Sequence, residues 1–143
     1  WFTLALSGEA AGCPGGRPTG VVVEDNARLR AMMAERLERH GFRVLATATL
    51  EGMRTYLERE VVDVVSLDLL LGGERADAEV AALQEGGLLA TIPLVVVSVV
   101  PGHECRLRTA ACIEKPVSME KLAHVLEMVA KGGAVGTQAP GHR

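Results

Sequence analysis

The stretch Val61-Val62-Asp63-Val64-Val65-Ser66-Leu67-Asp68-Leu69-Leu70-Leu71 decides the fold. Most of its residues are branched and apolar, and the run is too short to cross a bilayer. Such a run is typical of a strand buried on both faces, as in a parallel sheet. We expect the strand to end at Asp68, and ligands of open α/β sheets bind at the carboxyl ends of strands. Asp68 is therefore a candidate reactive residue, although aspartate is also common in ordinary turns.

The composition fits one domain with a full hydrophobic core. The chain has 143 residues, 48% of them hydrophobic, and a formal net charge of −3. It has no block of Lys and Arg, which argues against nucleic-acid binding. Its apolar runs have the length of strands, so we expect no membrane contact by this segment. Three cysteines lack the spacing of metal ligands, and we interpret them as reduced thiols of a cytoplasmic domain.

Short apolar runs alternate with amphipathic segments along the chain. This alternation predicts an α/β domain with a doubly wound, five-stranded parallel sheet and helices on both faces. The expected strands are Val21–Val23, 42–47, the run through Asp68, Pro93–Ser98 and Ala111–Glu114. The first expected helix begins after the cap Asn26 and ends at Gly41. The next two are Thr49–Glu60 and Asp77–Glu85. A short fourth helix is expected within 103–109, and the last helix is capped by Ser118. The fourth helix is shortened because Pro101-Gly102 opens its segment.

Polar residues fall at the ends of four of the expected strands. Glu24-Asp25 follows the first strand, Asp68 the third, Ser98 the fourth and Lys115 the fifth. Right-handed crossovers bring these ends to one edge of the sheet. We therefore expect three carboxylates, one hydroxyl and one ammonium group in a single shallow cleft.

These groups suit the capture of a phosphoryl group. Clustered carboxylates repel one another unless a cation lies among them, and Mg²⁺ prefers oxygen ligands. We expect Glu24, Asp25, Asp68 and the backbone carbonyl of Leu70 to hold Mg²⁺. Asp68 is then the nucleophile that forms an acyl phosphate. The ammonium group of Lys115 and the hydroxyl of Ser98 are placed to contact the phosphoryl oxygens.

The segments Val21-Val22-Val23-Glu24-Asp25-Asn26, Ser66-Leu67-Asp68-Leu69, Val97-Ser98 and Lys115-Pro116 resemble the receiver domains of bacterial two-component response regulators. The resemblance covers residues 20–131 in order and implies a flavodoxin-like fold. It implies that Asp68 accepts phosphate, with Mg²⁺, from a histidine kinase or histidine phosphotransfer domain. Lys115-Pro116 resembles the family's Lys-Pro junction, whose peptide bond is commonly cis, although the sequence alone allows either isomer. Such a domain catalyses at most its own phosphorylation and dephosphorylation.

A second resemblance concerns the start of the chain. Trp1-Phe2-Thr3-Leu4 is similar to the closing strand of a histidine-kinase ATP-binding domain. It is followed by Ser7 to Gly20, a glycine- and proline-rich linker. We therefore expect a kinase remnant with its linker in residues 1–19, a receiver in 20–131 and a disordered tail in 132–143. The parent chain is then a hybrid sensor histidine kinase, whose membrane-bound part would tether this cytoplasmic segment.

Four features depart from the receiver pattern. Cys112 stands where the family usually has an aromatic ring that rotates on activation, and Val99 stands where a small residue is usual. We expect Val99 to crowd the phosphoryl pocket. Gly72-Gly73 replaces a proline and predicts a mobile loop, and the segment opened by Pro101-Gly102 is short. We hypothesise that output depends on loop ordering or partner docking and not on ring rotation.

Other functions fit the sequence less well. A pseudo-receiver that docks a partner without phosphorylation is favoured by Val99 and Cys112 but opposed by the complete set of polar residues. A phosphohydrolase of the haloacid-dehalogenase type needs a second aspartate where this chain has Leu70. A nucleotide-binding domain needs a glycine-rich loop after the first strand, and none is present there.

Overall fold

The computed structural model describes residues 16–100 and 107–132. In these residues, five parallel strands form one sheet in the order β2-β1-β3-β6-β7. The strands are β1 (Thr19–Val23), β2 (Arg43–Thr47), β3 (Val64–Leu67), β6 (Leu94–Ser98) and β7 (Ala111–Glu114). With these five strands counted along the chain, the order is 2-1-3-4-5, which is that of flavodoxin-like folds. The predicted fold class is confirmed.

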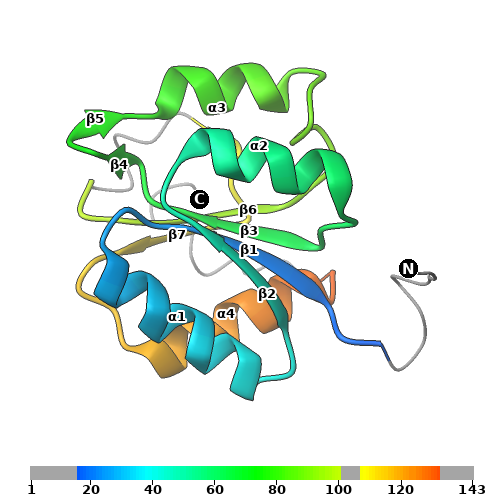
Figure 1. The fold of residues 1–143 in the computed structure, drawn as a ribbon, viewed down its shortest axis with the longest axis vertical. Helices are drawn as coiled ribbons and strands as arrows, with labels where there is room; N and C mark the ends of the chain where they lie inside the picture. The colour runs from blue at the N-terminus through cyan, green and yellow to red at the C-terminus, as the bar shows by residue number, and fades with distance from the viewer. Residues whose placement is uncertain (1–15, 101–106, 133–143) are drawn as a thin grey trace, which may run out of the picture.

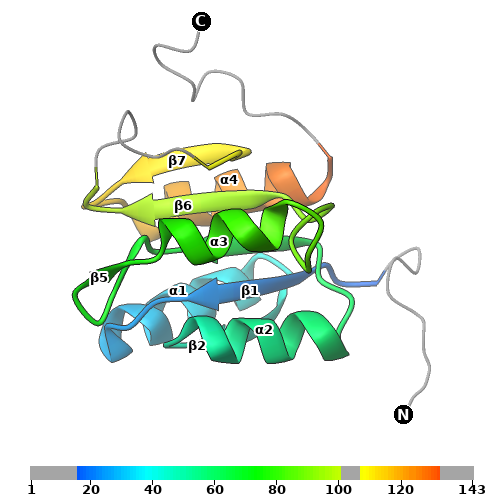
Figure 2. The ribbon, with the colours of Figure 1, turned by 90° about the horizontal axis from the view of Figure 1, so that it is seen from above.

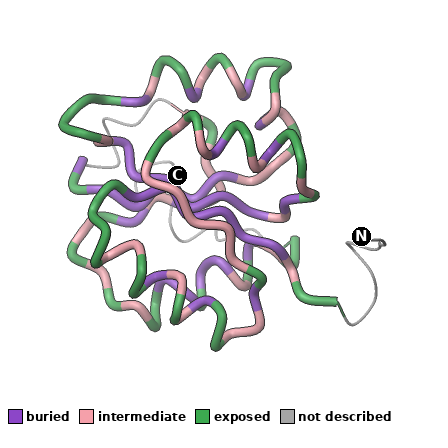
Figure 3. The backbone as a smooth tube through the Cα atoms, in the orientation of Figure 1, coloured by how far each residue is buried: buried purple, intermediate pink, exposed green. Residues whose placement is uncertain are grey.

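Helices cover both faces of this sheet (Figures 1 and 2). Helices α1 (Ala27–Arg39) and α4 (Met119–Ala130) lie on one face, and α2 (Leu50–Arg59) and α3 (Asp77–Gln84) lie on the other. Alternate residues of the strands face the two layers: Val22 packs with the α1 and α4 side, whereas Val21 and Val23 pack with the α2 and α3 side. Figure 3 shows the buried residues gathered on the central strands, as expected for a sheet that helices cover on both faces.

The helix ends follow local signals in the sequence. The side chains of Asn26, Thr49 and Ser118 accept hydrogen bonds from N–H groups in the first turns of α1, α2 and α4. Gly41 follows α1 with a φ of 93°, a conformation that suits glycine after a helix. The apolar spacing of Leu29, Met32, Met33 and Leu37 predicts one buried stripe on α1, but Met32 is 46% exposed whereas Met33 is buried. Met32 therefore lies at the edge of the buried stripe that contains Met33 and Leu37.

The third strand ends next to Asp68, as expected, and the leucines that follow form a separate short strand. Strand β3 ends at Leu67, and Val61 at the start of the run is 63% exposed. Leu70–Leu71 instead forms β4, which pairs antiparallel with β5 (Glu74–Arg75). Gly72 and Gly73 connect them with φ values of 63° and 84°, the conformation of a tight two-residue hairpin turn. The expected loop is therefore a hairpin, and its mobility stays a prediction.

Several expectations concern residues outside the described ranges. These are the strand expected at Trp1-Phe2-Thr3-Leu4, most of the linker, residues 133–143 of the tail, and most of the short fourth helix. The described end of that helix segment, residues 107–109, is not helical. There, the buried side chain of Gln84 bonds the backbone N–H and C=O of Arg108, which joins the end of α3 to the segment before β7. Among the helices of the described residues, none has the length and apolarity needed to span a membrane.

Candidate functional site

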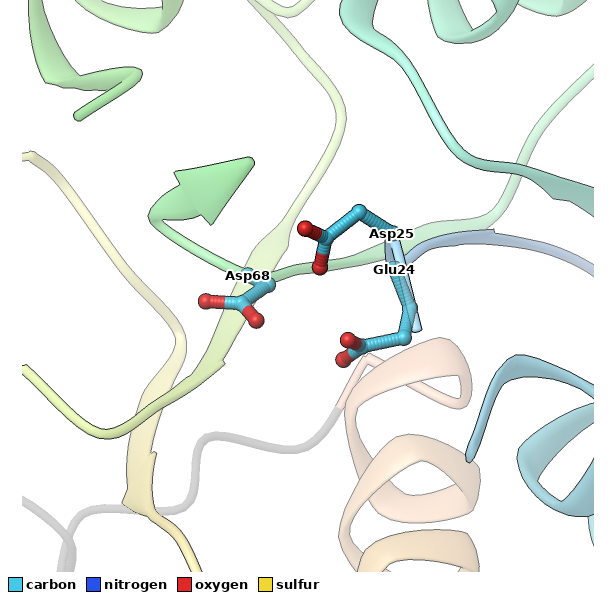
Figure 4. A group of neighbouring side chains, drawn as sticks. All are labelled: Glu24, Asp25 and Asp68. Carbon is cyan, nitrogen blue, oxygen red and sulfur yellow. The ribbon is translucent and has the colours of Figure 1, made fainter. Parts of the chain in front are cut away.

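Glu24, Asp25 and Asp68 come together where β1 and β3 end (Figure 4). These strands are neighbours, with Val23 opposite Leu67, and the Asp68 N–H donates to the Val23 carbonyl. The residues that follow the two strands therefore leave the sheet at the same level. Each acid offers one carboxylate oxygen, and these oxygens lie within 4.8 Å of one another. Figure 4 shows the three carboxylates turned toward a common space.

Asp68 is almost fully buried, with 6% of its surface exposed, and both of its oxygens accept hydrogen bonds. Oδ1 accepts from the Ser98 hydroxyl at 2.8 Å and from the Leu70 N–H at 2.9 Å. Oδ2 accepts from the Lys115 ammonium at 2.9 Å. The two oxygens therefore differ, because Oδ1 accepts from two donors and Oδ2 accepts from the Lys115 ammonium group alone.

Lys115 bridges two of the acids. Its Nζ lies 2.8 Å from Glu24 Oε1 as well as 2.9 Å from Asp68 Oδ2. Its backbone N–H donates to the Ser98 carbonyl, which aligns the end of β7 with the end of β6. The Lys115–Pro116 peptide bond that follows is cis, as the resemblance implied. One ammonium group thus offsets part of the repulsion between two buried carboxylates.

Burial and hydrogen bonding act in opposite directions on these groups. Burial raises the pKa of Glu24 above its ordinary value, although the hydrogen bonds from Lys115 and from the Asn26 N–H lower it. Burial lowers the pKa of Lys115, but its hydrogen bonds to Glu24 and Asp68 outweigh this effect, and the pKa is raised. Lys115 therefore stays an ammonium ion at neutral pH.

Asp25 is exposed and links the acid site, which consists of Glu24, Asp25 and Asp68, to the β4–β5 hairpin. Its Oδ2 accepts a hydrogen bond from the Gly72 N–H at 2.9 Å. Sequence reasoning missed this contact, although a Gly-Gly pair between two short runs is itself a signal for a hairpin. Leu70 lies between the hydrogen-bonded pairs of that hairpin, so its N–H and C=O both point away from β5. Its N–H reaches Asp68, and its carbonyl lies on the same side of the strand.

The acid site has the chemistry that a Mg²⁺ ion requires. All of its side-chain donors are hard carboxylate oxygens, and two of the three acids, Glu24 and Asp68, are buried. Oxygens that share one Mg²⁺ at about 2.1 Å are separated by at most about 4.2 Å. The observed limit of 4.8 Å therefore requires only small side-chain adjustments. Among the contacts of the described residues, no donor occupies Oδ1 of Asp25, which leaves this oxygen for a cation.

The residues that depart from the receiver pattern lie at or near this site. Val99 follows Ser98 and is 60% exposed, and its expected crowding of the pocket stays a prediction. Cys112 is half-buried, packs against the core on the α2 and α3 side, and has its Sγ 3.5 Å from the hydroxyl of Thr109. Neither residue interrupts the hydrogen bonds of Asp68 described above.

Solved structures with the same fold are numerous, whereas no protein-family model matches the chain. A sensor protein from Polaromonas sp. JS666 superposes with a TM-score of 0.71 and 20% identity, over 81% of this chain and 98% of that one. A chemotaxis response regulator of Vibrio cholerae gives a TM-score of 0.69 and 18% identity, over 79% and 98%. A response regulator from Burkholderia pseudomallei, solved with a phosphorylated aspartic acid, a calcium ion and citrate, gives 0.65 and 18% identity, over 88% and 75%. The described chain thus has the fold of response-regulator receiver domains.

Proposed function

We propose that this domain is the phosphoacceptor receiver of a two-component phosphorelay. In this proposal Asp68 takes a phosphoryl group from the phosphohistidine of a histidine kinase or of a histidine phosphotransfer domain. The observation that supports it most directly is the environment of Asp68. This buried carboxylate contacts both an ammonium group and a hydroxyl, and two further acids lie beside it.

The difference between the two Asp68 oxygens indicates how the transfer would proceed. Oδ1 is held by Ser98 and Leu70, so Oδ2 is the oxygen that attacks phosphorus. A new P–O bond forms while the P–N bond of the phosphohistidine breaks. The electron pair of that bond returns to the imidazole, which takes up a proton. No proton has to leave Asp68, because it reacts as a carboxylate.

Lys115 and Ser98 would then exchange partners. Lys115 contacts Asp68 Oδ2 before transfer and can pass its hydrogen bond to a phosphoryl oxygen afterwards. Ser98 can do the same by rotating its hydroxyl away from Oδ1. Because the two donors come from the ends of β6 and β7, this exchange would carry information to the segments that follow these strands.

Glu24, Asp25, Asp68 and the Leu70 carbonyl are the groups that would hold Mg²⁺. When bound, this ion neutralises the charge that develops on the phosphoryl oxygens. The solved Burkholderia pseudomallei response regulator contains a phosphorylated aspartic acid and a calcium ion. That structure supports the pairing of an aspartyl phosphate with a divalent cation in this fold.

Mass spectrometry of the intact protein tests the proposal. The protein is incubated with acetyl phosphate and Mg²⁺, and we expect the addition of one phosphoryl group. Asp68→Asn should abolish the addition, and EDTA should prevent it. Asp77→Asn serves as the matched control, because Asp77 lies in α3 and pairs with Arg75 outside the acid site.

Two results would contradict the proposal. One is addition of the phosphoryl group that survives in Asp68→Asn. The other is no addition from acetyl phosphate or from a phosphorylated histidine kinase of the same organism. The second result would favour a domain that docks its partner without phosphorylation.

A further inference from the structure

A groove lies beside the acid site, between the start of α2, the β4–β5 hairpin and the start of α3. Its volume is about 390 Å³, within the range of about 300–1,000 Å³ that is typical of small-ligand sites. Leu50, Leu71 and Ala76 contribute apolar surface to it. The carboxylates that line it are Asp25, Glu74 and Glu79. The groove therefore combines an apolar surface with a negative rim.

The charges of the groove are unbalanced. Arg75 is its only lining residue with a positive charge among those described, against three carboxylates. The guanidinium group of Arg75 is also bound by both oxygens of Asp77, at 2.8 and 3.0 Å. Asp77 already offsets this positive charge, and the starts of α2 and α3 add about half a positive charge each. The three carboxylates outweigh these partial charges, so the net charge of the lining is negative and favours cations.

We propose that this groove binds a small organic cation, a guanidinium or primary amine at the end of a short aliphatic stem. The apolar surface would pack against the stem, and the carboxylates would accept hydrogen bonds from the cationic head. Phosphorylated or carboxylated ligands are repelled by the same rim. An inorganic divalent cation would bind better at the acid site, where the carboxylate oxygens lie within 4.8 Å of one another.

The groove and the acid site share one residue. Asp25 lines the groove and also offers an oxygen to the cluster with Glu24 and Asp68. An organic cation could therefore bind at the acid site instead, and the experiment must separate the two locations. Glu74 and Glu79 line the groove alone and are exposed, so glutamine at these positions leaves the core intact. Asp68 belongs to the acid site alone.

Agmatine, a guanidinium on a four-carbon stem, is a suitable probe. It is titrated into the whole chain in EDTA, and binding is followed by calorimetry and by the NMR shifts of backbone amides. We expect saturable binding at one site, with shifts at Leu71, Gly72 and Glu79. The double variant Glu74→Gln, Glu79→Gln should weaken binding about tenfold. Asp68→Asn should weaken binding far less than the double variant does, because Asp68 does not line the groove, and this difference separates the inference from the proposed phosphoryl transfer.

Three results would overturn the inference. The first is the absence of saturable binding. The second is binding that Asp68→Asn abolishes but the double glutamine variant does not change, because the cation would then occupy the acid site. The third is equal binding of pentanol, a neutral molecule with a similar stem, since the carboxylates would then have no part in recognition.

Discussion

Lys115→Met should strongly destabilise the metal-free protein. Methionine keeps much of the aliphatic stem of lysine but removes the charge. The Lys115 ammonium group bonds Glu24 at 2.8 Å and Asp68 at 2.9 Å. Glu24 is 1% exposed and Asp68 is 6% exposed, so both carboxylates would stay buried without a cation.

The size of the effect follows from these contacts. A hydrogen bond to a charged group contributes about 1.5–3 kcal/mol, so two of them contribute about 3–6 kcal/mol. Water that enters the space of the ammonium group reduces the lost stabilisation, and it can enter because the Lys115 side chain is already 15% exposed. We therefore expect a loss of about 3 kcal/mol in the free energy of unfolding, near the range for breaking a buried ion pair. This corresponds to a fall in melting temperature of roughly 10 °C.

Urea denaturation in EDTA at neutral pH measures the change. Lys131→Met is the matched control, because Lys131 also contacts a carboxylate, that of Glu127, but its side chain is 73% exposed. An exposed pair of this kind contributes little to stability, because water screens it. Added Mg²⁺ should restore part of the lost stability in Lys115→Met, because it binds the folded acid site and replaces the missing positive charge.

The effect should also depend on pH in a defined direction. The folded-state pKa of Lys115 is raised above its ordinary value of 10.5, so its contribution is complete below pH 10.5 and is lost as the pH rises through the folded pKa. The folded-state pKa of Glu24 is raised above 4.5, so this carboxyl group destabilises the fold as the pH rises from 4.5 through the folded pKa. The deficit of Lys115→Met should therefore shrink on acidification, when Glu24 becomes neutral. Equal unfolding free energies of Lys115→Met and Lys131→Met at neutral pH would refute this reasoning.

Three further substitutions test the packing. Ser66→Ala should raise the free energy of unfolding, measured by urea denaturation, by about 1 kcal/mol. The reason is that the buried Ser66 hydroxyl has no hydrogen-bond partner among the described residues. A loss of stability would show that the hydroxyl has a partner. Gly52→Ala should lower the melting temperature, because the new Cβ would lie within 2.9 Å of the Thr47 side chain. This clash opposes the helix preference of alanine. A higher melting temperature would show that the Thr47 side chain moves aside. Gln84→Ala should lower the free energy of unfolding by about 2 kcal/mol, because the Arg108 backbone loses its hydrogen bonds to the Gln84 side chain. Hydrogen exchange of the Arg108 amide should become faster, and unchanged exchange would contradict this role.

Much of the fold was predictable from local patterns. Runs such as Leu94–Ser98 are apolar at nearly every position, which is stable only in a strand that helices cover on both sides. Capping residues such as Ser118 place helix starts through bonds made within a few residues. Parallel strands bring their carboxyl ends to one edge, and for this reason the acids, Ser98 and Lys115 could be grouped before any contact was known.

Contacts between distant segments were decided only by the tertiary structure. The sequence did not indicate that Lys115 joins Glu24 to Asp68, or that Asp25 holds the Gly72 N–H, since these contacts join residues 47 to 91 positions apart. The central apolar run also leaves the sheet after Leu67, and Leu70–Leu71 pairs with β5 instead. Apolar character alone does not indicate the β4–β5 pairing, because the same leucines suit a longer β3 equally well. The sequence by itself thus determined the strands, the helix caps and the members of the acid site, because these depend on short-range patterns. The tertiary structure alone decided which oxygen of each acid is occupied, because that depends on how the strand ends and the hairpin pack together.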